Sequence, residues 1–170
     1  GYFNAQNAVN TAFGDNQADL SYTDSLNQFR VGYYLSYRNT KHNESIRQFD
    51  YSPTLKTRYE DTQNYKGEYH KWNASYQRYQ GNHLFNARVY YITDQGSEPT
   101  HGIGTIMDHT GIYSGLSARN TRSRANTGAV DLYYNYNTDN GKIFAINIVN
   151  TFGSSRSDSY RSLSFASPYD

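Results

Sequence analysis

Three arginines lie close together in the C-terminal half of the sequence, Arg119, Arg122 and Arg124. A guanidinium group presents a rigid fork of N–H donors that matches the oxygens of a phosphate or a carboxylate. The cluster therefore predicts binding of an anionic substrate or of the phosphates of lipopolysaccharide. The alternative is a solvated strand end that holds no ligand, and the spacing alone favours that alternative.

Three tyrosines, Tyr51, Tyr59 and Tyr65, fall within the polar stretch 39–68. Their rings could stack on a bound ligand, because an aromatic ring offers a large apolar face with a polar tip. The alternative is that they pack within the stretch or belong to an aromatic girdle. Together with the three arginines they make up the candidate ligand-binding residues.

Other groups of residues that could form a metal site or a catalytic site are incomplete. His101, Asp108 and His109 lie near one another in the sequence, but a metal site needs three or four ligands in matched geometry. Glu60 and Asp61 are adjacent and point apart in an extended chain, so they do not form an acid and base pair. No serine sits in a Gly-x-Ser-x-Gly pattern. The sequence predicts no catalytic residue, metal or cofactor, and we do not expect an enzyme.

The composition limits the classes of partner and fold. The chain has 170 residues, with 16 Lys and Arg against 15 Asp and Glu, and its net charge of +1 gives no general attraction to nucleic acid. It contains no cysteine, so disulfides are excluded. Hydrophobic residues make up 36% and aromatic residues 16%. This balance favours β-structure, and no apolar run approaches the roughly 20 residues of a membrane helix.

Short segments alternate between apolar and polar residues, with tyrosine as the commonest apolar residue. Such alternation gives a strand one apolar face and one polar face. The predicted strands, seven with a weaker eighth, cover residues 2–13, 17–24, 28–38, 69–80, 83–93, 127–138, 142–152 and 159–166. Most are near the roughly 9–11 residues with which a tilted strand crosses a bilayer.

The alternation also assigns a direction to each side chain. A charge on a lipid-facing surface costs about 2–4 kcal/mol at mid-depth, so we expect the uncharged set to face lipid. Its members are Val31, Tyr33, Leu35, Tyr37, Trp72, Ala74, Tyr76, Phe85, Ala87, Val89, Tyr91, Val130, Leu132, Tyr134, Tyr136, Phe144, Ile146 and Ile148. The set expected to face inward comprises Arg30, Ser36, Arg38, Lys71, Asn73, Ser75, Asn86, Arg88, Asp131 and Asn135. Ile143, Ala145 and Val149 are too apolar for water and should pack on something inside.

Tight connections alternate with long ones. Residues 24–27, 80–83 and 138–141 are rich in turn-forming types, and a short link is expected at 14–16. Long extracellular loops are predicted at 39–68 and 94–118. Short turns on one side and long loops on the other are typical of outer-membrane barrels. The sequence thus predicts an all-β, antiparallel up-and-down transmembrane β-barrel, with residues 1–170 as a single segment of it.

Several strand patterns resemble those of TonB-dependent outer-membrane receptors of Bacteroidetes. The similar segments are 1–8, 13–22, 28–38, 129–134 and 145–152. The resemblance implies a barrel of roughly 22 strands with an N-terminal plug in the bacterial outer membrane. It also implies energised uptake of a scarce solute, with TonB as the periplasmic partner and a surface lipoprotein as a candidate partner. The chain holds neither a plug nor a TonB box, so we expect a part of a larger barrel.

Two alternatives remain open. One is a complete eight-stranded outer-membrane barrel with a structural or adhesive role, in which strand 159–166 pairs with strand 2–13. The other is a soluble β-sandwich that binds carbohydrate, in which the aromatic faces pack against a second sheet. A membrane location would be excluded if the rest of the chain enclosed Tyr33, Trp72, Val89 and Leu132.

Overall fold

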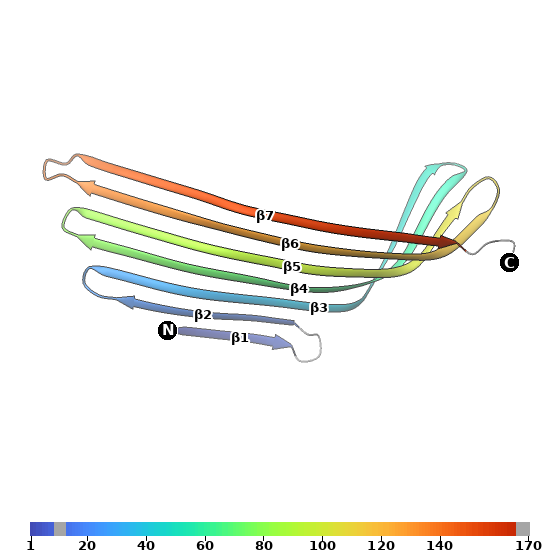
Figure 1. Cartoon of the computed structure of the whole chain (residues 1–170), viewed down its shortest axis with the longest axis horizontal. Coiled ribbons are helices and arrows are strands. Elements are labelled where there is room, and N and C mark those ends of the chain that lie inside the picture. The colour runs from blue at the N-terminus through green and yellow to red at the C-terminus, as the bar shows by residue number, and fades with distance from the viewer. Residues whose placement is uncertain (9–12, 166–170) are drawn as a thin grey trace. The chain divides into compact units, whose positions relative to one another are not determined.

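The computed structural model describes residues 1–8 and 13–165, which form seven β-strands and no helix (Figure 1). The strands are β1 (Tyr2–Ala8), β2 (Phe13–Thr23), β3 (Asn27–Ser52), β4 (Leu55–Gln80), β5 (His83–Met107), β6 (Ile112–Asn137) and β7 (Ile143–Phe165). The described part of the chain therefore offers no helix with the length and hydropathy to cross a membrane.

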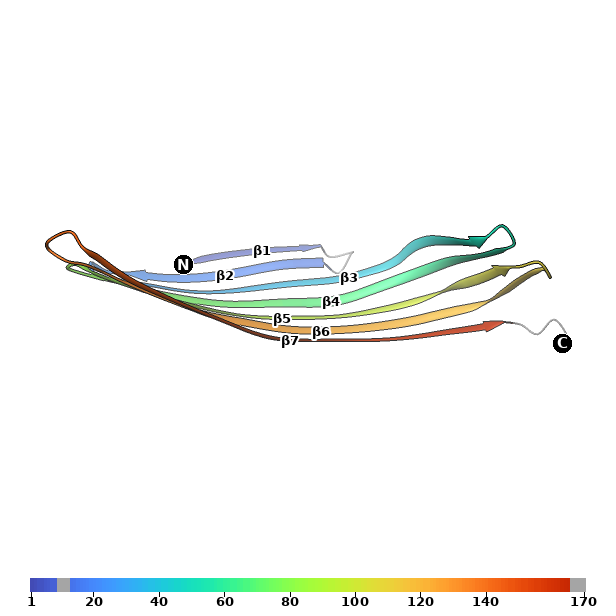
Figure 2. The same ribbon diagram turned by 90° about the horizontal axis from the view of Figure 1, so that it is seen from above.

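The seven strands belong to one sheet in which each strand lies beside its neighbours in the sequence. This order can be followed from β1 to β7 in Figure 2. β1 and β2 pair antiparallel, from Tyr2 opposite Asp19 to Ala8 opposite Phe13. The prediction of an all-β, antiparallel up-and-down arrangement is confirmed. Within the described residues the sheet is open, with β1 and β7 at its edges.

Contacts divide the chain into two compact units. Unit 1 comprises Gly1–Tyr37, Glu68–Gln95 and Arg124–Arg156. Unit 2 comprises Arg38–Gly67, Gly96–Ser123 and the chain from Ser157 onward. Each of the strands β3 to β7 therefore contributes one part of its length to unit 1 and the other part to unit 2.

The prediction of long loops at 39–68 and 94–118 is wrong. These segments continue β3, β4, β5 and β6, and their connections are confined to residues 53–54 and 108–111. They fall largely within unit 2. The prediction failed because alternation reveals a strand only where one of its faces is apolar. Unit 2 carries polar residues on both faces, whereas the backbone hydrogen bonds that define a strand do not depend on side-chain polarity.

The predicted boundaries also fail near both ends of the chain. The strand predicted at 2–13 ends at Ala8 as β1, and residues 9–12 lie outside the described residues. The link predicted at 14–16 is part of β2, because pairing with β1 continues through it. The predicted eighth strand, 159–166, is the end of β7, with residue 166 outside the described residues. No turn interrupts β7 before it, so its pairing with β6 continues.

The three predicted tight turns are confirmed by their backbone geometry. In the first, Asp24 Oδ1 accepts hydrogen bonds from the amides of Leu26 and Asn27 at 2.8 and 2.7 Å. These bonds, from Leu26 first, lower the pKa of Asp24 below its ordinary value of 3.8. In the other two, Gly81 and Gly141 have φ angles of 56° and 79°, a region that favours glycine.

β3 contains one extra residue near His42. In unit 1, even positions of β3 share a face with odd positions of β4, as the contact of Tyr34 with Tyr69 indicates. In unit 2, odd positions of both strands share a face, because Arg47 pairs with Asp61. His42 lies between these points with a φ of 60°, and its amide donates to a side-chain oxygen on β4. A β-bulge at His42 accounts for the change of face.

The described residues contain almost no hydrophobic core. Ala129 is the one buried hydrophobic residue among them. The buried polar residues are Asp19, Thr57, Asp61, Thr100 and Ser117. Large apolar side chains are exposed instead, including Trp72 at 52% and Val89 at 45%. A single sheet has no second layer of its own to cover such a face.

Candidate functional surfaces

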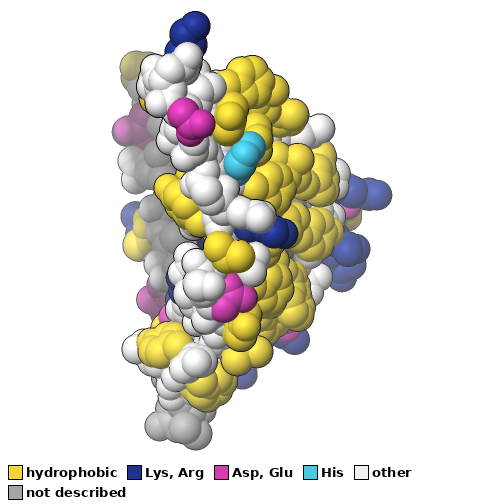
Figure 3. Space-filling view, turned by 90° about the vertical axis from the view of Figure 1, so that its left-hand side faces the viewer, with side chains coloured by type: hydrophobic (Ala, Val, Ile, Leu, Met, Phe, Trp, Pro, Cys, Tyr) yellow, Lys and Arg dark blue, Asp and Glu magenta, His cyan; other side chains and the backbone are white. Residues whose placement is uncertain are grey.

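One face of unit 1 is apolar across several neighbouring strands. Tyr33 on β3 packs on Trp72 of β4 with ring centroids 4.1 Å apart, and Tyr76 of β4 lies 6.2 Å from Phe85 of β5. A shallow hollow on this face includes among its lining residues Phe29, Ala74, Tyr76, Ala87, Val89, Val130 and Leu132. Figure 3 shows hydrophobic side chains gathered along one side of the sheet. We call this face of unit 1 the apolar surface.

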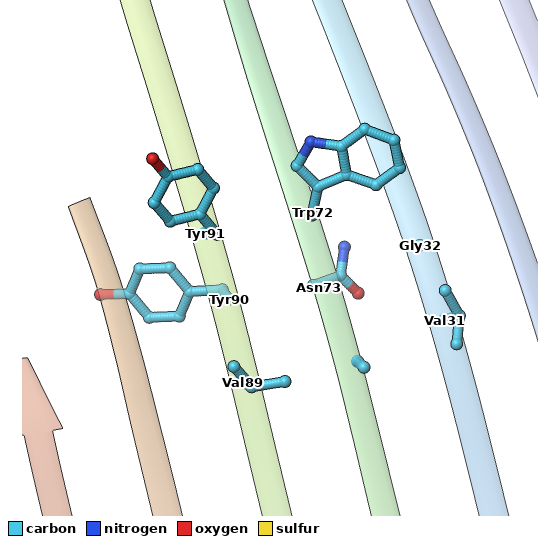
Figure 4. A pocket seen from close by; sticks show the side chains of 8 residues that line it. Val31, Gly32, Trp72, Asn73, Val89, Tyr90 and Tyr91 are labelled. Carbon is cyan, nitrogen blue, oxygen red and sulfur yellow. The ribbon is translucent and has the colours of Figure 1, made fainter. Parts of the chain in front are cut away.

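The residues predicted to face lipid lie together on the apolar surface. Figure 4 shows Val31, Trp72 and Val89 on adjacent strands around one hollow. A Cβ at Gly128 would meet the ring of Phe152, so the even positions of β6 and β7 share this face. Alternation then adds the even residues 144–148 of β7 to the set. Contact of these side chains with lipid stays a prediction.

Charged residues mark the ends of the apolar surface rather than its middle. Within unit 1, the charged residues at the even positions of β4, which share the apolar surface, are Glu68 and Arg78, one near each end. The charged residues of this face on β6 and β7 are Arg124 and Arg156, both at one end of the surface. On β3 the segment 27–37 carries no charge at the positions that share the surface. The uncharged band therefore extends for about 11 residues, the length with which a tilted strand crosses a bilayer.

Two histidines belong to the apolar surface. The ring Nδ1 of His70 lies 2.8 Å from the hydroxyl of Tyr33. His83 stacks on Tyr136 with ring centroids 4.6 Å apart, and its Nδ1 lies 2.7 Å from the hydroxyl of Tyr134. Both rings are thus part of aromatic clusters with satisfied polar tips, the arrangement that suits the border between an apolar and a wet environment.

The opposite face of unit 1 is polar and contains charges. Arg30 donates to the buried carboxylate of Asp19, with Nη2 and Oδ1 3.1 Å apart. Gly32 lies beside this pair, and a Cβ there would come within 2.6 Å of Asp19 Oδ1 and 2.7 Å of the amide of Asn73. A polar hollow nearby is lined by Gln17, Tyr34, Tyr69, Lys71 and Asn73. Arg30, Lys71 and Asn73 had been predicted for this face.

β7 departs from this division because it is apolar on both faces. Ile143 and Val149 lie on the polar side of the sheet, yet they are 71% and 61% exposed. The expectation that they pack on something inside has no counterpart among the described residues. β7 is the edge of the described sheet, so only one neighbouring strand shields its side chains.

The structure separates the three predicted arginines. Arg119 donates to Glu98 on β5 with Nη2 and Oε1 2.8 Å apart, and its own Nε is buried without a partner among the described residues. Alternation places Arg122 and Arg124 on the other face of β6. Both are exposed, Arg122 in unit 2 and Arg124 in unit 1. Arg119 is therefore not part of one site with the other two.

The predicted tyrosines of unit 2 have different surroundings. The guanidinium of Arg161 lies 4.3 Å from the ring centroid of Tyr59, and that of Arg47 lies 5.8 Å from it. Tyr51 is exposed and stacks on Phe49 at 6.3 Å. We call this group of cationic and aromatic side chains the Tyr59 cluster, and its members are Arg47, Phe49, Tyr51, Tyr59 and Arg161. Tyr65 lies apart, against Gly67 and Gly96.

The Tyr59 cluster also holds a buried ion pair that the sequence did not reveal. Asp61 is 3% exposed and pairs with Arg47. Gly102 makes room for it, because a Cβ there would lie 2.7 Å from Asp61 Oδ1. Glu60 points the other way and pairs with Arg58, as expected for adjacent residues in a strand. The extra residue in β3 brings Arg47 to this face, and no periodicity in the sequence marks that change.

The histidines and carboxylates of the described residues form no group of three that could hold a metal ion. Asp108, considered with His101 and His109, accepts hydrogen bonds from the hydroxyl and amide of Thr110. These bonds, from the hydroxyl first, lower the pKa of Asp108 below its ordinary value of 3.8. Asp108 thus belongs to a turn.

No protein-family model and no curated protein matches this chain. The described residues present three candidate functional surfaces, which are the apolar surface and the polar face of unit 1 and the Tyr59 cluster of unit 2.

Proposed function

We propose that this chain is a wall segment of an outer-membrane β-barrel receptor of the TonB-dependent type, which binds and imports a scarce solute. On this proposal the apolar surface of unit 1 faces lipid and the opposite face lines an aqueous interior. The observation that carries it is the uncharged band of about 11 residues per strand, because that length suits a tilted strand across a bilayer.

The lack of a core supports a lipid neighbour for this band. Folded domains in water gain most of their stability from burying apolar surface. The described residues instead leave Trp72 and Val89 about half exposed and bury one hydrophobic residue. Hydrocarbon chains would cover these side chains, and in that setting strands need only satisfy their backbone groups through pairing.

The polar face and unit 2 suit contact with water and solute. Arg30, Asp19 and Lys71 lie on the face opposite the apolar surface, as the alternation of a water-filled barrel requires. Unit 2 carries charges on both faces of β4, with Asp61 on one and Arg58 on the other. We place solute capture at the Tyr59 cluster, where guanidinium groups and aromatic rings are joined.

The resemblance to TonB-dependent receptors supplies the partners in this proposal. The remaining strands close the barrel against the edges β1 and β7, a plug fills the interior, and TonB provides energy from the periplasm. A surface lipoprotein is the candidate partner on the outer side. No described residue is assigned a catalytic role.

Two other readings have less support. A complete eight-stranded barrel needs an eighth strand, and the segment predicted for it is the end of β7. A soluble β-sandwich needs a second sheet over the aromatic face, and the described residues form one sheet.

The natural lack of cysteine makes a direct test simple. Single cysteines at Val89 and Leu132, on the apolar surface, and at Arg88 and Asn73, on the polar face, would carry a spin label in native outer membranes. We expect the first two labels to be reached by oxygen dissolved in lipid and the second two by a water-soluble nickel complex. Equal access of the nickel complex to all four labels would overturn the proposal.

A further inference from the structure

A polar hollow lies on the polar face of unit 1, where β2, β3 and β4 are neighbours in the sheet. It has a volume of about 280 Å³ and is lined by five half-buried residues, Gln17, Tyr34, Tyr69, Lys71 and Asn73. The last three occupy alternate positions of β4, so their side chains leave the sheet on the same face. One strand therefore supplies most of the wall of this hollow.

The polar ends of the three β4 residues have no partner among the described residues. The ammonium group of Lys71 takes part in no hydrogen bond or ion pair there, and neither does the hydroxyl of Tyr69 or the amide of Asn73. All three groups can donate hydrogen bonds, and one of them carries a positive charge. A set of this kind suits a ligand that accepts several hydrogen bonds.

Two carboxylates of β2 beside the hollow are already engaged by other groups. Asp19 accepts hydrogen bonds from Gln17 at 2.6 Å and from Arg30 at 3.1 Å. Asp15 accepts a hydrogen bond from the hydroxyl of Tyr34 at 2.8 Å. The lining residues on β2 and β3 are thus tied to carboxylates, whereas those on β4 are not.

Lys71 is left as the positive charge of the hollow. Asp94 lies on the same face of β5 as Arg88, but it is exposed and forms no ion pair with Lys71. A half-buried charge without a partner costs stability, because part of its water shell is lost on folding. An anion from outside the described chain would offset that cost.

We propose that this hollow binds an oxyanion, a carboxylate or a phosphate, with the ammonium group of Lys71 as its counter-charge. Hydrogen bonds between an ammonium group and such an anion are charge-assisted, and partial burial strengthens them because less water screens the charges. Tyr69 and Asn73 offer further donors on either side of Lys71. The rings of Tyr34 and Tyr69, with centroids 5.9 Å apart, give the rest of the ligand an apolar wall.

This site narrows the class of solute that the proposed function involves. The Tyr59 cluster, where we place solute capture, presents guanidinium groups, among them that of Arg161 over the ring of Tyr59. An imported solute that meets both places would carry at least one carboxylate or phosphate group. That part of the inference rests on the proposed function, whereas binding of an oxyanion in the hollow does not.

The test follows the reactivity of the lysine side chains in the complete gene product, purified in mild detergent. A water-soluble reagent acylates free amines, and mass spectrometry measures the rate at each lysine. Inorganic phosphate and acetate are the probes, added separately at an ionic strength held constant with chloride. We expect them to slow acylation of Lys71 several-fold and to leave the exposed Lys142 unchanged. Protection by phosphate alone or by acetate alone would identify which oxyanion the hollow prefers.

Variants then test whether the charge of Lys71 binds the anion. Lys71→Met removes the charge and keeps the length of the side chain, so we expect the anion to bind roughly tenfold more weakly in titration calorimetry. The matched control is Lys142→Met, which removes the same charge outside the hollow and should bind the anion like the natural chain.

Three outcomes would overturn the inference. The first is an equal rate of acylation at Lys71 with and without the anions, including no reaction at all, which would mean that another part of the protein fills the hollow. The second is equal protection of Lys142, and the third is equal anion binding by the natural chain and Lys71→Met. Equal access of the nickel complex to all four spin labels would instead contradict the membrane location and leave the oxyanion site standing, so the two failures are distinguishable.

Discussion

Units 1 and 2 are built from the same strands but differ in the side chains that one face of those strands presents. On β4, even positions in unit 1 include Trp72 and Ala74, whereas even positions in unit 2 include Arg58 and Glu60. Pairing between strands continues through both. Backbone hydrogen bonds therefore maintain each strand through both units, whereas the side chains on its faces differ with the surroundings of each unit.

The largest difference in stability between the two units is expected when an arginine is introduced on the same face of β6 in each of them. We expect Leu132→Arg, on the apolar surface, to cost about 2–4 kcal/mol of stability in a bilayer. Leu116→Arg, on the same face of β6 in unit 2 and 72% exposed, should change it by at most about 0.5 kcal/mol. Urea unfolding of both variants in lipid vesicles measures the difference. Equal losses would mean that the two units share one environment.

The buried ion pair of unit 2 offers the next largest effect. Arg47→Met leaves the carboxylate of Asp61 buried without its cation, which we expect to cost about 1.5–3 kcal/mol. The control is Arg58→Met, whose partner Glu60 is exposed, with an expected cost of about 0–1 kcal/mol. Thermal unfolding followed by circular dichroism compares them. A cost for Arg58→Met as large as that for Arg47→Met would contradict the assigned burial.

The polar face of unit 1 can be tested at Gly32. A methyl group there would press on Asp19 and Asn73, so we expect Gly32→Ala to cost about 1–3 kcal/mol through overpacking. Ser36→Ala, on the same face of β3, serves as the control and should be nearly neutral. The urea midpoint is the measurement. If Gly32→Ala were also neutral, the packing of Arg30 and Asp19 around this glycine would be wrong.

The smallest expected effect is the pH dependence of two turns, one in each unit. Asp24 and Asp108 both have a pKa lowered by hydrogen bonds to their carboxylates. A lowered folded-state pKa stabilises the fold above the ordinary value of 3.8. That stabilisation is lost as the pH falls below about 4 and through the folded-state pKa. Asp24→Asn should flatten this part of the stability curve, as measured by unfolding midpoints between about pH 2 and pH 6. An unchanged stability curve would mean that the hydrogen bonds to the Asp24 carboxylate do not cause this pH dependence.

The sequence predicted the parts of the fold where one local signal decides the structure. The alternation from Val31 to Tyr37 and the glycines at 81 and 141 were sufficient for strands and turns in unit 1. The continuation of the strands into unit 2 could not be predicted, because polar residues on both faces give no period. The bulge at His42 was equally hidden, since a single residue with positive φ has no compositional mark.

The candidate sites were likewise predictable only where a local signal in the sequence marks them. Side chains on the apolar surface were predicted from the alternation of apolar and polar residues. Asp61 was missed because its pairing with Arg47 depends on the extra residue in β3. Arg161 was missed because its contact with Tyr59 joins β7 to β4, which are far apart in the sequence. The cluster of Arg119, Arg122 and Arg124 was proposed from nearness along the chain. Alternation within β6 divides it, because odd and even positions of a strand point to opposite faces.

The outer edge of β7 has a consequence for how such a chain must be made. Residues 143–149 are apolar or amide-bearing, with no charge, proline or glycine, and their edge pairs with no other described strand. Short segments of this kind are the ones that stack into cross-β fibrils when left in water. If the chain is exported as proposed, we expect it to need a holding chaperone until another strand has paired with this edge.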